Sequence, residues 1–288
     1  MLDRIMVATS RTRPQAEPLL KLINNIPIQA AILTHCVESV LPIPSRDQGA
    51  VRRAERELEQ WVAEVQKLTD VPVQAMVRIG IPAQQIIQAA REQDADTIVV
   101  SAFVEMPWQD FFIGSTALDI IRYGHTNMLV LHPPGTNEQI AGGLQRPLLE
   151  HVLFPTDFSE YSRVAFEAFS TLADKGLKRV SLVHIQDVTR IAPYLMERLG
   201  EFDATDNERL EEMAAQLRER GTEVDCYLEL GVPEQGIIKK ASELGASCIA
   251  IGSRGRTRDE ALRWGSVSER VVRRAEMPVL IIKQGQTS

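Results

Sequence analysis

Short apolar runs alternate along this chain with segments in which apolar residues recur every three or four positions. The short runs predict β-strands, and the periodic segments predict α-helices. Strands that are apolar nearly throughout are typical of a parallel sheet with helices on both faces, so the sequence predicts the α/β class. In the second half, strands are expected at 151–155, 179–185, 223–229, 246–251 and 278–283. Helices are expected after Ser159 and over 207–220, 233–244 and 265–275.

The same order of elements occurs twice in the chain. The strand that ends at Ser10 aligns with the strand that ends at Asp157, at an offset of 147 residues. Near the other end of each half, Gly114 aligns with Gly265 at an offset of 151. Offsets that drift by only a few residues over a shared order of elements indicate a duplicated domain.

The duplication predicts how the chain divides. We expect a first, degenerate domain at 1–134, a linker at 135–147 and a second domain at 148–288. The linker is predicted from the proline and glycine residues that cluster there, which are typical of irregular connections. Each half is long enough to bury a hydrophobic core of its own.

Composition narrows the classes of function. The 288 residues are 44% hydrophobic and 25% charged, which is typical of a globular protein. A net charge of −7 without a basic stripe argues against a nucleic-acid binder. The sequence has no signal-peptide pattern and no apolar run near the roughly 20 residues of a membrane helix, so we expect no membrane contact and a cytoplasmic location. Three widely spaced cysteines fit reduced thiols better than a disulfide framework or a zinc site.

The segment from Gly252 to Ser268 carries the candidate chemistry. Gly252 and Gly255 lack Cβ atoms, so the backbone there can approach phosphate oxygens and can adopt a positive φ. Gly265 and Ser266 begin a predicted helix, whose free N–H groups favour an anion, and the hydroxyl groups of Ser266 and Ser268 would add donors. A tight turn followed by a serine N-cap would explain each glycine singly. The fixed spacing of all of them favours a phosphate site.

Asp157 follows Pro155 and Thr156 at the end of the first strand of the second half. Ligands of open parallel sheets bind beyond the carboxyl ends of the strands, so Asp157 and Gly252 are expected to share one crevice. The carboxylate of Asp157 suits an acceptor for an adenine or a ribose. It also suits a cap of the following helix, alongside Ser159, and the two roles are compatible.

Together these motifs resemble the universal stress protein family. The resemblance rests on the segment F-P-T-D-F-S-E at 154–160, on Gly231-Val-Pro233, and on the loop that begins at Gly252, which matches that family's ATP-binding pattern G-x2-G-x9-G-[S/T]. It covers both halves, as in the tandem members of the family. It implies two open-twisted, parallel, five-stranded sheets of the Rossmann-related adenine nucleotide alpha hydrolase type, paired as a pseudo-dimer through their last strands.

The resemblance further implies a bound ATP, with Mg²⁺ or Mn²⁺, and a regulatory role in the response to stress. Asp157 and the backbone around Ile185 would hold the adenine and the ribose, and the glycine loop and the following helix would hold the phosphates. The residues implied for this nucleotide site are Pro155, Thr156, Asp157, Ile185, Gly252, Arg254, Gly255, Gly265, Ser266, Val267 and Ser268.

The first half departs from this pattern. Ser10, Ser101 and Val104 stand where the second half has the aspartate and the first two glycines, and only Gly114-Ser115 is retained. A β-branched side chain at 104 disfavours close approach to a phosphate, so we expect ATP only in the second domain. The apolar loop 103–112 either packs over the sheet ends or forms a contact surface for an unidentified protein.

Other functions stay open at this point. Slow ATP hydrolysis or phosphoryl transfer would need a base or water-orienting residue, which the sequence does not identify, although Arg254 and Arg256 could form a cationic clamp. An ATP-independent interaction module would act through the apolar loop. A homodimer of the tandem chain is compatible with each of these functions. His35 and His184 close equivalent strands and are interpreted as repeat architecture, and no catalytic residue or metal ligand is assigned.

Overall fold

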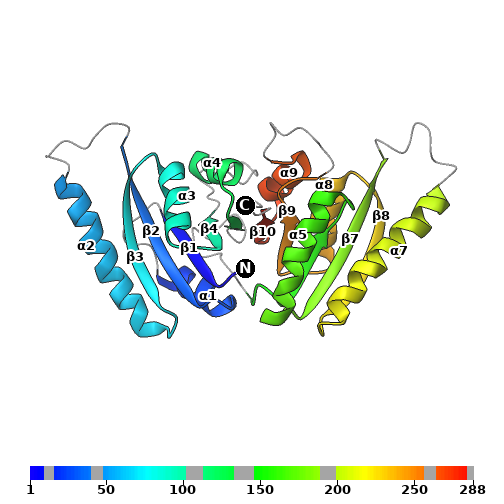
Figure 1. The fold of residues 1–288 in the computed structure, drawn as a ribbon, viewed down its shortest axis with the longest axis horizontal. Coiled ribbons are helices and arrows are strands. Elements are labelled where there is room, and N and C mark those ends of the chain that lie inside the picture. The colour runs from blue at the N-terminus through cyan, green and yellow to red at the C-terminus, as the bar shows by residue number, and fades with distance from the viewer. Residues whose placement is uncertain are drawn as a thin grey trace. The chain divides into compact units, whose positions relative to one another are not determined.

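A computed structural model describes residues 1–9, 16–39, 48–101, 113–132, 146–188, 199–255 and 264–283. The described residues form two compact units, one before and one after the segment 133–145. Figure 1 draws the first unit from blue to green-cyan and the second from green to red. Most of the predicted linker 135–147, the loop 103–112 and Ser10, Val104 and Arg256 lie outside the described residues.

The first unit contains a five-stranded parallel sheet with the strand order β3-β2-β1-β4-β5. In this sheet Ile5 of the central strand lies opposite Ala31 on one side and Thr97 on the other. The strands are β1 (Arg4–Thr9), β2 (Ala30–Glu38), β3 (Val73–Gly80), β4 (Thr97–Ser101) and β5 (Asn127–Leu131). The helices are α1 (Ala16–Asn25), α2 (Gln48–Val65), α3 (Pro82–Glu92) and α4 (Ser115–Tyr123), with a 3₁₀ turn at Gln66–Leu68.

The second unit repeats this topology, with the strand order β10-β9-β6-β7-β8. The strands are β6 (His151–Pro155), β7 (Arg179–Asp187), β8 (Glu223–Gly231), β9 (Cys248–Gly252) and β10 (Val279–Ile282). The helices are α5 (Glu160–Ser170), α7 (Leu199–Arg218), α8 (Pro233–Glu243) and α9 (Ser266–Arg274), with a 3₁₀ turn at Thr171–Lys175. The predicted α/β class with two parallel five-stranded sheets is confirmed.

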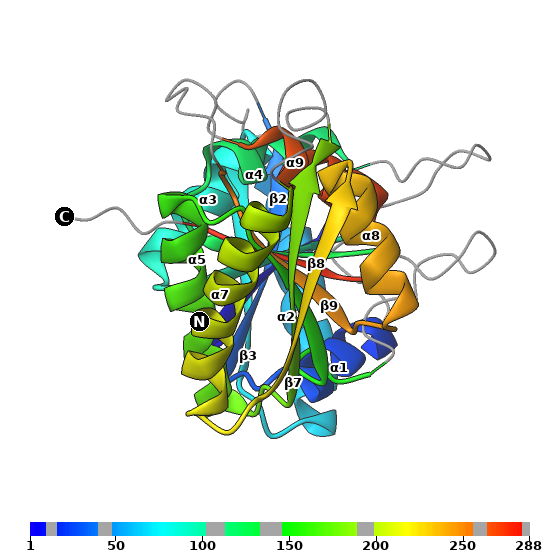
Figure 2. The same cartoon turned by 90° about the vertical axis from the view of Figure 1, so that its right-hand side faces the viewer.

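Helices cover both faces of the sheet in the second unit. Helices α5 and α7 lie on one side of β7 and β8, and α8 lies on the other (Figure 2). Every residue of β6 is buried, and Phe154 of this strand stacks on Phe169 of α5, with ring centroids 4.8 Å apart. The central strands are therefore buried on both faces, which explains why they read as continuous apolar runs.

In the second unit, the order in which the chain adds strands to the sheet reverses once. The chain runs outward from β6 through β7 to β8 and then returns to β9 and β10 on the other side of β6. The neighbouring strands β6 and β9 therefore flank a topological switch point, and in open α/β sheets ligands bind at the carboxyl ends of such strands. The loops that leave β6 and β9 carry Asp157 and Gly255.

One helix differs from the prediction. Helix α7 begins at Leu199, not near Asn207, although it ends close to the expected position, before Gly221 with its φ of 84°. In the added part of the helix, the carboxylates of Asp203 and Asp206 accept hydrogen bonds from Gln186 Nε2, at 3.1 Å each. Within the described residues no helix has the length and apolar character to span a bilayer.

Candidate functional site

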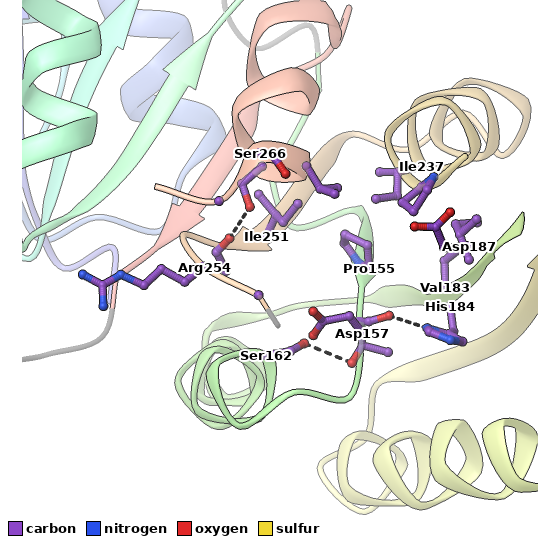
Figure 3. A pocket seen from close by; sticks show the side chains of 18 residues that line it. Pro155, Asp157, Ser162, Val183, His184, Asp187, Ile237, Ile251, Arg254 and Ser266 are labelled. Atoms are coloured by element: carbon purple, nitrogen blue, oxygen red, sulfur yellow. Dashed lines mark hydrogen bonds between the residues drawn. The ribbon is translucent and has the colours of Figure 1, made fainter. Parts of the chain in front are cut away.

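A cavity of about 140 Å³ lies at the carboxyl ends of β6, β7 and β9, and the first turns of α8 and α9 complete its walls (Figure 3). All eleven residues that the resemblance implied for a nucleotide site line this cavity. The structure thus brings together segments that lie up to about a hundred residues apart in the sequence. Seven further residues line it: Ser162, Val183, His184, Asp187, Pro233, Ile237 and Ile251.

At Gly252, which ends β9, and at Gly255, in the loop that follows, glycine is required because a side chain would not fit, and not because the backbone adopts an unusual conformation. A Cβ atom at Gly255 would lie 2.6 Å from Oδ2 of Asp157, and one at Gly252 would lie 3.2 Å from Cβ of Ala165. Neither glycine has a positive φ, so the conformational freedom expected from the sequence is not used. The missing side chains let this loop lie against α5 and against the carboxylate of Asp157.

Asp157 takes part in the turn that leads from β6 into α5. Its Oδ1 accepts hydrogen bonds from the backbone N–H of Ser159 at 3.0 Å and from the Ser159 hydroxyl at 2.6 Å. The Ser159 hydroxyl oxygen in turn caps α5 by accepting from the N–H of Ser162 at 3.2 Å. Between them Phe158 has a φ of 57°, a left-handed conformation that is uncommon for a bulky residue and that concentrates at functional sites. The turn therefore fixes one carboxylate oxygen, and Asp157 also lines the cavity.

Thr156 is buried and connects this turn to the neighbouring strand. Its N–H donates to the carbonyl of Val183 at 2.9 Å, and its hydroxyl lies 3.0 Å from that of Ser162. Its carbonyl accepts from Nδ1 of His184 at 2.7 Å, while Nε2 of the same ring lies 3.6 Å from a carboxylate oxygen of Asp206. His184 therefore supports the Asp157 turn from β7.

The first unit repeats this histidine contact. Nδ1 of His35 lies 3.2 Å from the carbonyl of Thr9, which corresponds to the contact between His184 and Thr156. The repetition agrees with the interpretation of the two histidines as part of the duplicated architecture.

The start of α9 faces the cavity without a side-chain cap. Gly265 is the N-cap residue and makes no side-chain hydrogen bond, and Ser266, Val267 and Ser268 follow it along the cavity wall. The first N–H groups of a helix have no partner within the helix, and together with the helix dipole they favour an anion. The buried hydroxyl of Ser268 donates to the carbonyl of Gly252 at 2.7 Å, so its proton is used within the fold and is not offered to a ligand, contrary to expectation.

Arg254 is one of the residues that line the cavity, but its guanidinium points away from the cavity (Figure 3). The guanidinium carbon lies 5.8 Å from the centroid of the Tyr161 ring, a cation–π distance. In this conformation Arg254 does not form the cationic clamp considered from the sequence.

The side of the cavity opposite Ser266 is apolar. Val183, Ile185 and Ile237 line it, and Gly236 of α8 comes so close that an added Cβ would lie 2.9 Å from Cδ1 of Ile185. One carboxylate is present among these side chains, that of Asp187, the last residue of β7. The cavity therefore combines an apolar region with an anion-binding helix start, which is the usual composition of a ligand site.

The first unit retains only part of this arrangement. Helix α4 begins at Ser115 after Gly114, again without a side-chain cap, and Ser101 ends β4 at the position equivalent to Gly252. Unlike Gly252, Gly255 and Gly265 of the second unit, Gly114 has no atom within 4 Å of an added Cβ.

The sequence analysis did not assign Val183, Asp187 and Ile237 to the site because these residues belong to no motif. Pro233 was part of a motif but was given no role in the site. Two signals could have identified these residues. Asp187 lies two residues after Ile185 at the end of the same strand, so both side chains project on the same face. Pro233 and Ile237 are spaced four apart at the start of a helix, and therefore share one side of it.

In each unit the helix before the last strand begins without a side-chain cap. Two units of this topology define a tandem member of the Rossmann-related α/β class. The model of the universal stress protein family matches residues 1–132 and 149–283. The chain belongs to the universal stress protein family.

Relatives match one or both halves. A universal stress protein of Mycolicibacterium smegmatis is 26% identical over 240 residues, which cover 81% of this chain and 76% of the relative. One from Methanocaldococcus jannaschii is 27% identical over 156 residues, covering 48% of this chain and 96% of the relative, so that relative matches a single half. A solved universal stress protein from Archaeoglobus fulgidus has a TM-score of 0.73 at 20% identity, covering 99% of this chain and 100% of its own, and therefore has the same fold.

Proposed function

We propose that this chain is an ATP-binding regulatory protein that binds one adenine nucleotide, in the cavity of the second unit. The observation that carries the proposal is that the eleven residues implied by the family motif line one cavity at the switch point of the sheet. Sites for adenine nucleotides in α/β folds occupy this position.

The phosphate groups would lie at the start of α9. Ser266, Val267 and Gly255 line this part of the cavity. Backbone N–H groups at a helix start and in a glycine loop attract an anion without a charged side chain. The adenine would occupy the apolar region beside Ile185, and Asp157 would accept hydrogen bonds from the ribose.

A divalent ion would accompany the phosphates. Within the described residues no group of three or more His, Cys, Asp or Glu side chains could hold a metal ion. Mg²⁺ usually keeps several waters and binds through substrate phosphates plus one or two protein oxygens, so an ion brought by ATP fits this site without a protein cage. Its role would be to neutralise phosphate charge next to Asp157.

Binding, and not hydrolysis, is the proposed activity. Phosphoryl transfer needs a positioned base or water-orienting residue and cationic groups on the transferring phosphate. The guanidinium of Arg254 lies over Tyr161, outside the cavity, and His184 uses Nδ1 to hold Thr156. The three cysteines are free thiols, which fits our proposal that the protein works in the reducing cytoplasm.

Equilibrium binding of Mg-ATP to the full chain, freed of any co-purified nucleotide, tests the proposal. We expect Asp157→Ala to weaken binding at least about 10-fold, which corresponds to about 1.4 kcal/mol. The control is Asp174→Ala, which removes an exposed carboxylate outside the cavity and should leave the affinity unchanged. Absence of ATP binding by the unaltered protein, or equal affinity in the Asp157 variant, would overturn the proposal.

A turnover assay separates binding from the enzymatic alternative. The unaltered protein and Asp157→Ala should release phosphate from ATP at the same background rate. Phosphate release by the unaltered protein at a rate well above that of the Asp157 variant would show that the protein is an ATPase.

A further inference from the structure

We propose that the ion pair between Glu234 and Arg270 fixes the separation between the two ends of the cavity, so that both are positioning residues for the nucleotide. Neither residue is among those that line the cavity, and the pair acts through the helices that do. The inference rests on the proposed function of the same cavity and adds two residues that lie outside the glycine motif.

The pair joins the two helices that complete the walls of the cavity. Nη1 of Arg270 in α9 donates a hydrogen bond to Oε1 of Glu234 in α8, at 2.8 Å, and the two helices pack against each other. Figure 3 shows Ile237 and Ser266 reaching the cavity from these two separate helices. The pair therefore links the apolar wall, which would hold the adenine, to the helix start that would hold the phosphates.

The pair differs from an ordinary surface ion pair because the glutamate is buried. The side chain of Glu234 is 7% exposed, whereas that of Arg270 is 55% exposed. A buried carboxylate is costly without a cationic partner, and a buried pair is costly to break by removing one member. The start of α8 and the guanidinium of Arg270 both stabilise this negative charge. The link between the helices is therefore maintained by the cost of separating the two charges.

The spacing along each helix places the pair one turn from the cavity. Arg270 follows Ser266 by four residues and shares its side of α9, and Glu234 precedes Ile237 by three residues and shares its side of α8. A shift of either helix would move the phosphate-binding end relative to the apolar wall. A ligand that spans both ends binds best when this separation is fixed before it arrives.

The first unit lacks the pair. At the offset of 151 residues that aligns the two helix starts, Ala83 of α3 stands for Glu234 and Asp119 of α4 stands for Arg270. Helices α3 and α4 still pack against each other, although alanine and aspartate cannot form an ion pair. The topology therefore does not need the pair, which occurs in the half that carries the complete glycine motif.

The experiment measures dissociation constants of Mg-ATP for the full chain and its variants, at a temperature where melting curves show each of them folded. Glu234→Ala should weaken binding at least about 3-fold, as expected for loss of one coupled contact. Long-range charge predicts the opposite, because loss of a negative charge near the cavity favours a polyphosphate. Glu234→Gln keeps a carbonyl acceptor for Arg270, so its loss of affinity should be smaller.

Variants of the arginine separate the link from its charge. Arg270→Ala should also weaken binding, and the double variant with Glu234→Ala should lose no more affinity than Arg270→Ala alone, because both remove one interaction. Arg273→Ala is the matched control. It removes the same charge from the same helix, together with an ion pair to Glu269 that stays within α9, and should leave the affinity unchanged.

Three results would overturn the inference while leaving ATP binding in place. The first is a Glu234→Ala variant that binds Mg-ATP as tightly as the unaltered protein, or more tightly. The second is an equal loss in Arg270→Ala and Arg273→Ala, which general charge would explain. The third is a double variant in which the two single losses multiply. Failure of the unaltered protein to bind Mg-ATP would instead reject the proposed function itself.

Discussion

A Cβ atom added to Gly255 would lie 2.6 Å from Oδ2 of Asp157, closer than nonbonded atoms approach. The two residues belong to the loops after β9 and β6, which leave the sheet as neighbours at its switch point. Asp157 is fixed from the other side, because its Oδ1 accepts two hydrogen bonds from Ser159. The glycine therefore preserves the position of a carboxylate that lines the cavity.

This contact predicts the effect of Gly255→Ala. The added methyl group must push the loop or Asp157 away, and Asp157 cannot retreat without losing its bonds to Ser159. We expect ATP affinity to fall at least about 10-fold, with a stability loss of about 1 kcal/mol or less because the site is partly exposed. Calorimetric titration and thermal melting measure the two effects.

Gly114→Ala provides the matched control. Gly114 precedes the equivalent helix of the first unit, and nothing lies within 4 Å of its added Cβ. ATP affinity should not change in this variant. Equal losses in the two variants would show that the contact with Asp157 does not matter.

Ser159→Ala should weaken the second unit. The variant removes the N-cap of α5 and one of the two hydrogen bonds that hold Oδ1 of Asp157. Loss of such a cap costs about 1 kcal/mol, so the urea midpoint should fall accordingly. Ser242→Ala, at an exposed position within α8, should have no such effect. A Ser159 variant as stable as the unaltered protein would contradict the capping role.

Much of this site could be predicted from the sequence because each motif occupies the end of a strand. Apolar runs locate the strands, the duplication aligns them, and the parallel topology places their carboxyl ends together. Asp157 and Gly252, nearly a hundred residues apart, were therefore expected in one crevice, and the structure places them there.

What could not be predicted depends on tertiary contacts. The start of α7 at Leu199 was missed because the prediction followed the apolar face that begins near Leu210, whereas the earlier part of the helix makes a tertiary contact, in which Asp203 and Asp206 accept hydrogen bonds from Gln186 of β7. The orientation of the Arg254 guanidinium depends on Tyr161. Gln186 and Tyr161 lie in other segments of the chain than the residues they contact, so local sequence propensity carries no information about these contacts.

His151 predicts how stability depends on pH. Burial lowers the pKa of this side chain, and the positive charges of Arg179 and Arg146 lower it further. The unfolded chain, with a pKa near 6.5, therefore binds more protons than the folded chain just below that pH. The stability associated with neutral His151 is fully present above about pH 6.5 and is lost as the pH falls below it.

Melting temperatures between pH 5 and 7.5 measure this contribution. His151→Gln, which keeps a neutral hydrogen-bonding group next to Ser181, should melt with a shallower dependence on pH than the unaltered protein. The same slope in the His151 variant would show that its protonation is not linked to unfolding.

The number of nucleotides bound per chain tests the central claim most directly. The second unit has the carboxylate, the glycine loop and the uncapped helix, whereas the first retains only Gly114-Ser115 and the helix start. A calorimetric titration of the full chain with Mg-ATP should therefore give one site per chain, and Gly255→Ala should abolish or strongly weaken it. Two sites per chain, or one site that survives in Gly255→Ala with unchanged affinity, would contradict this account.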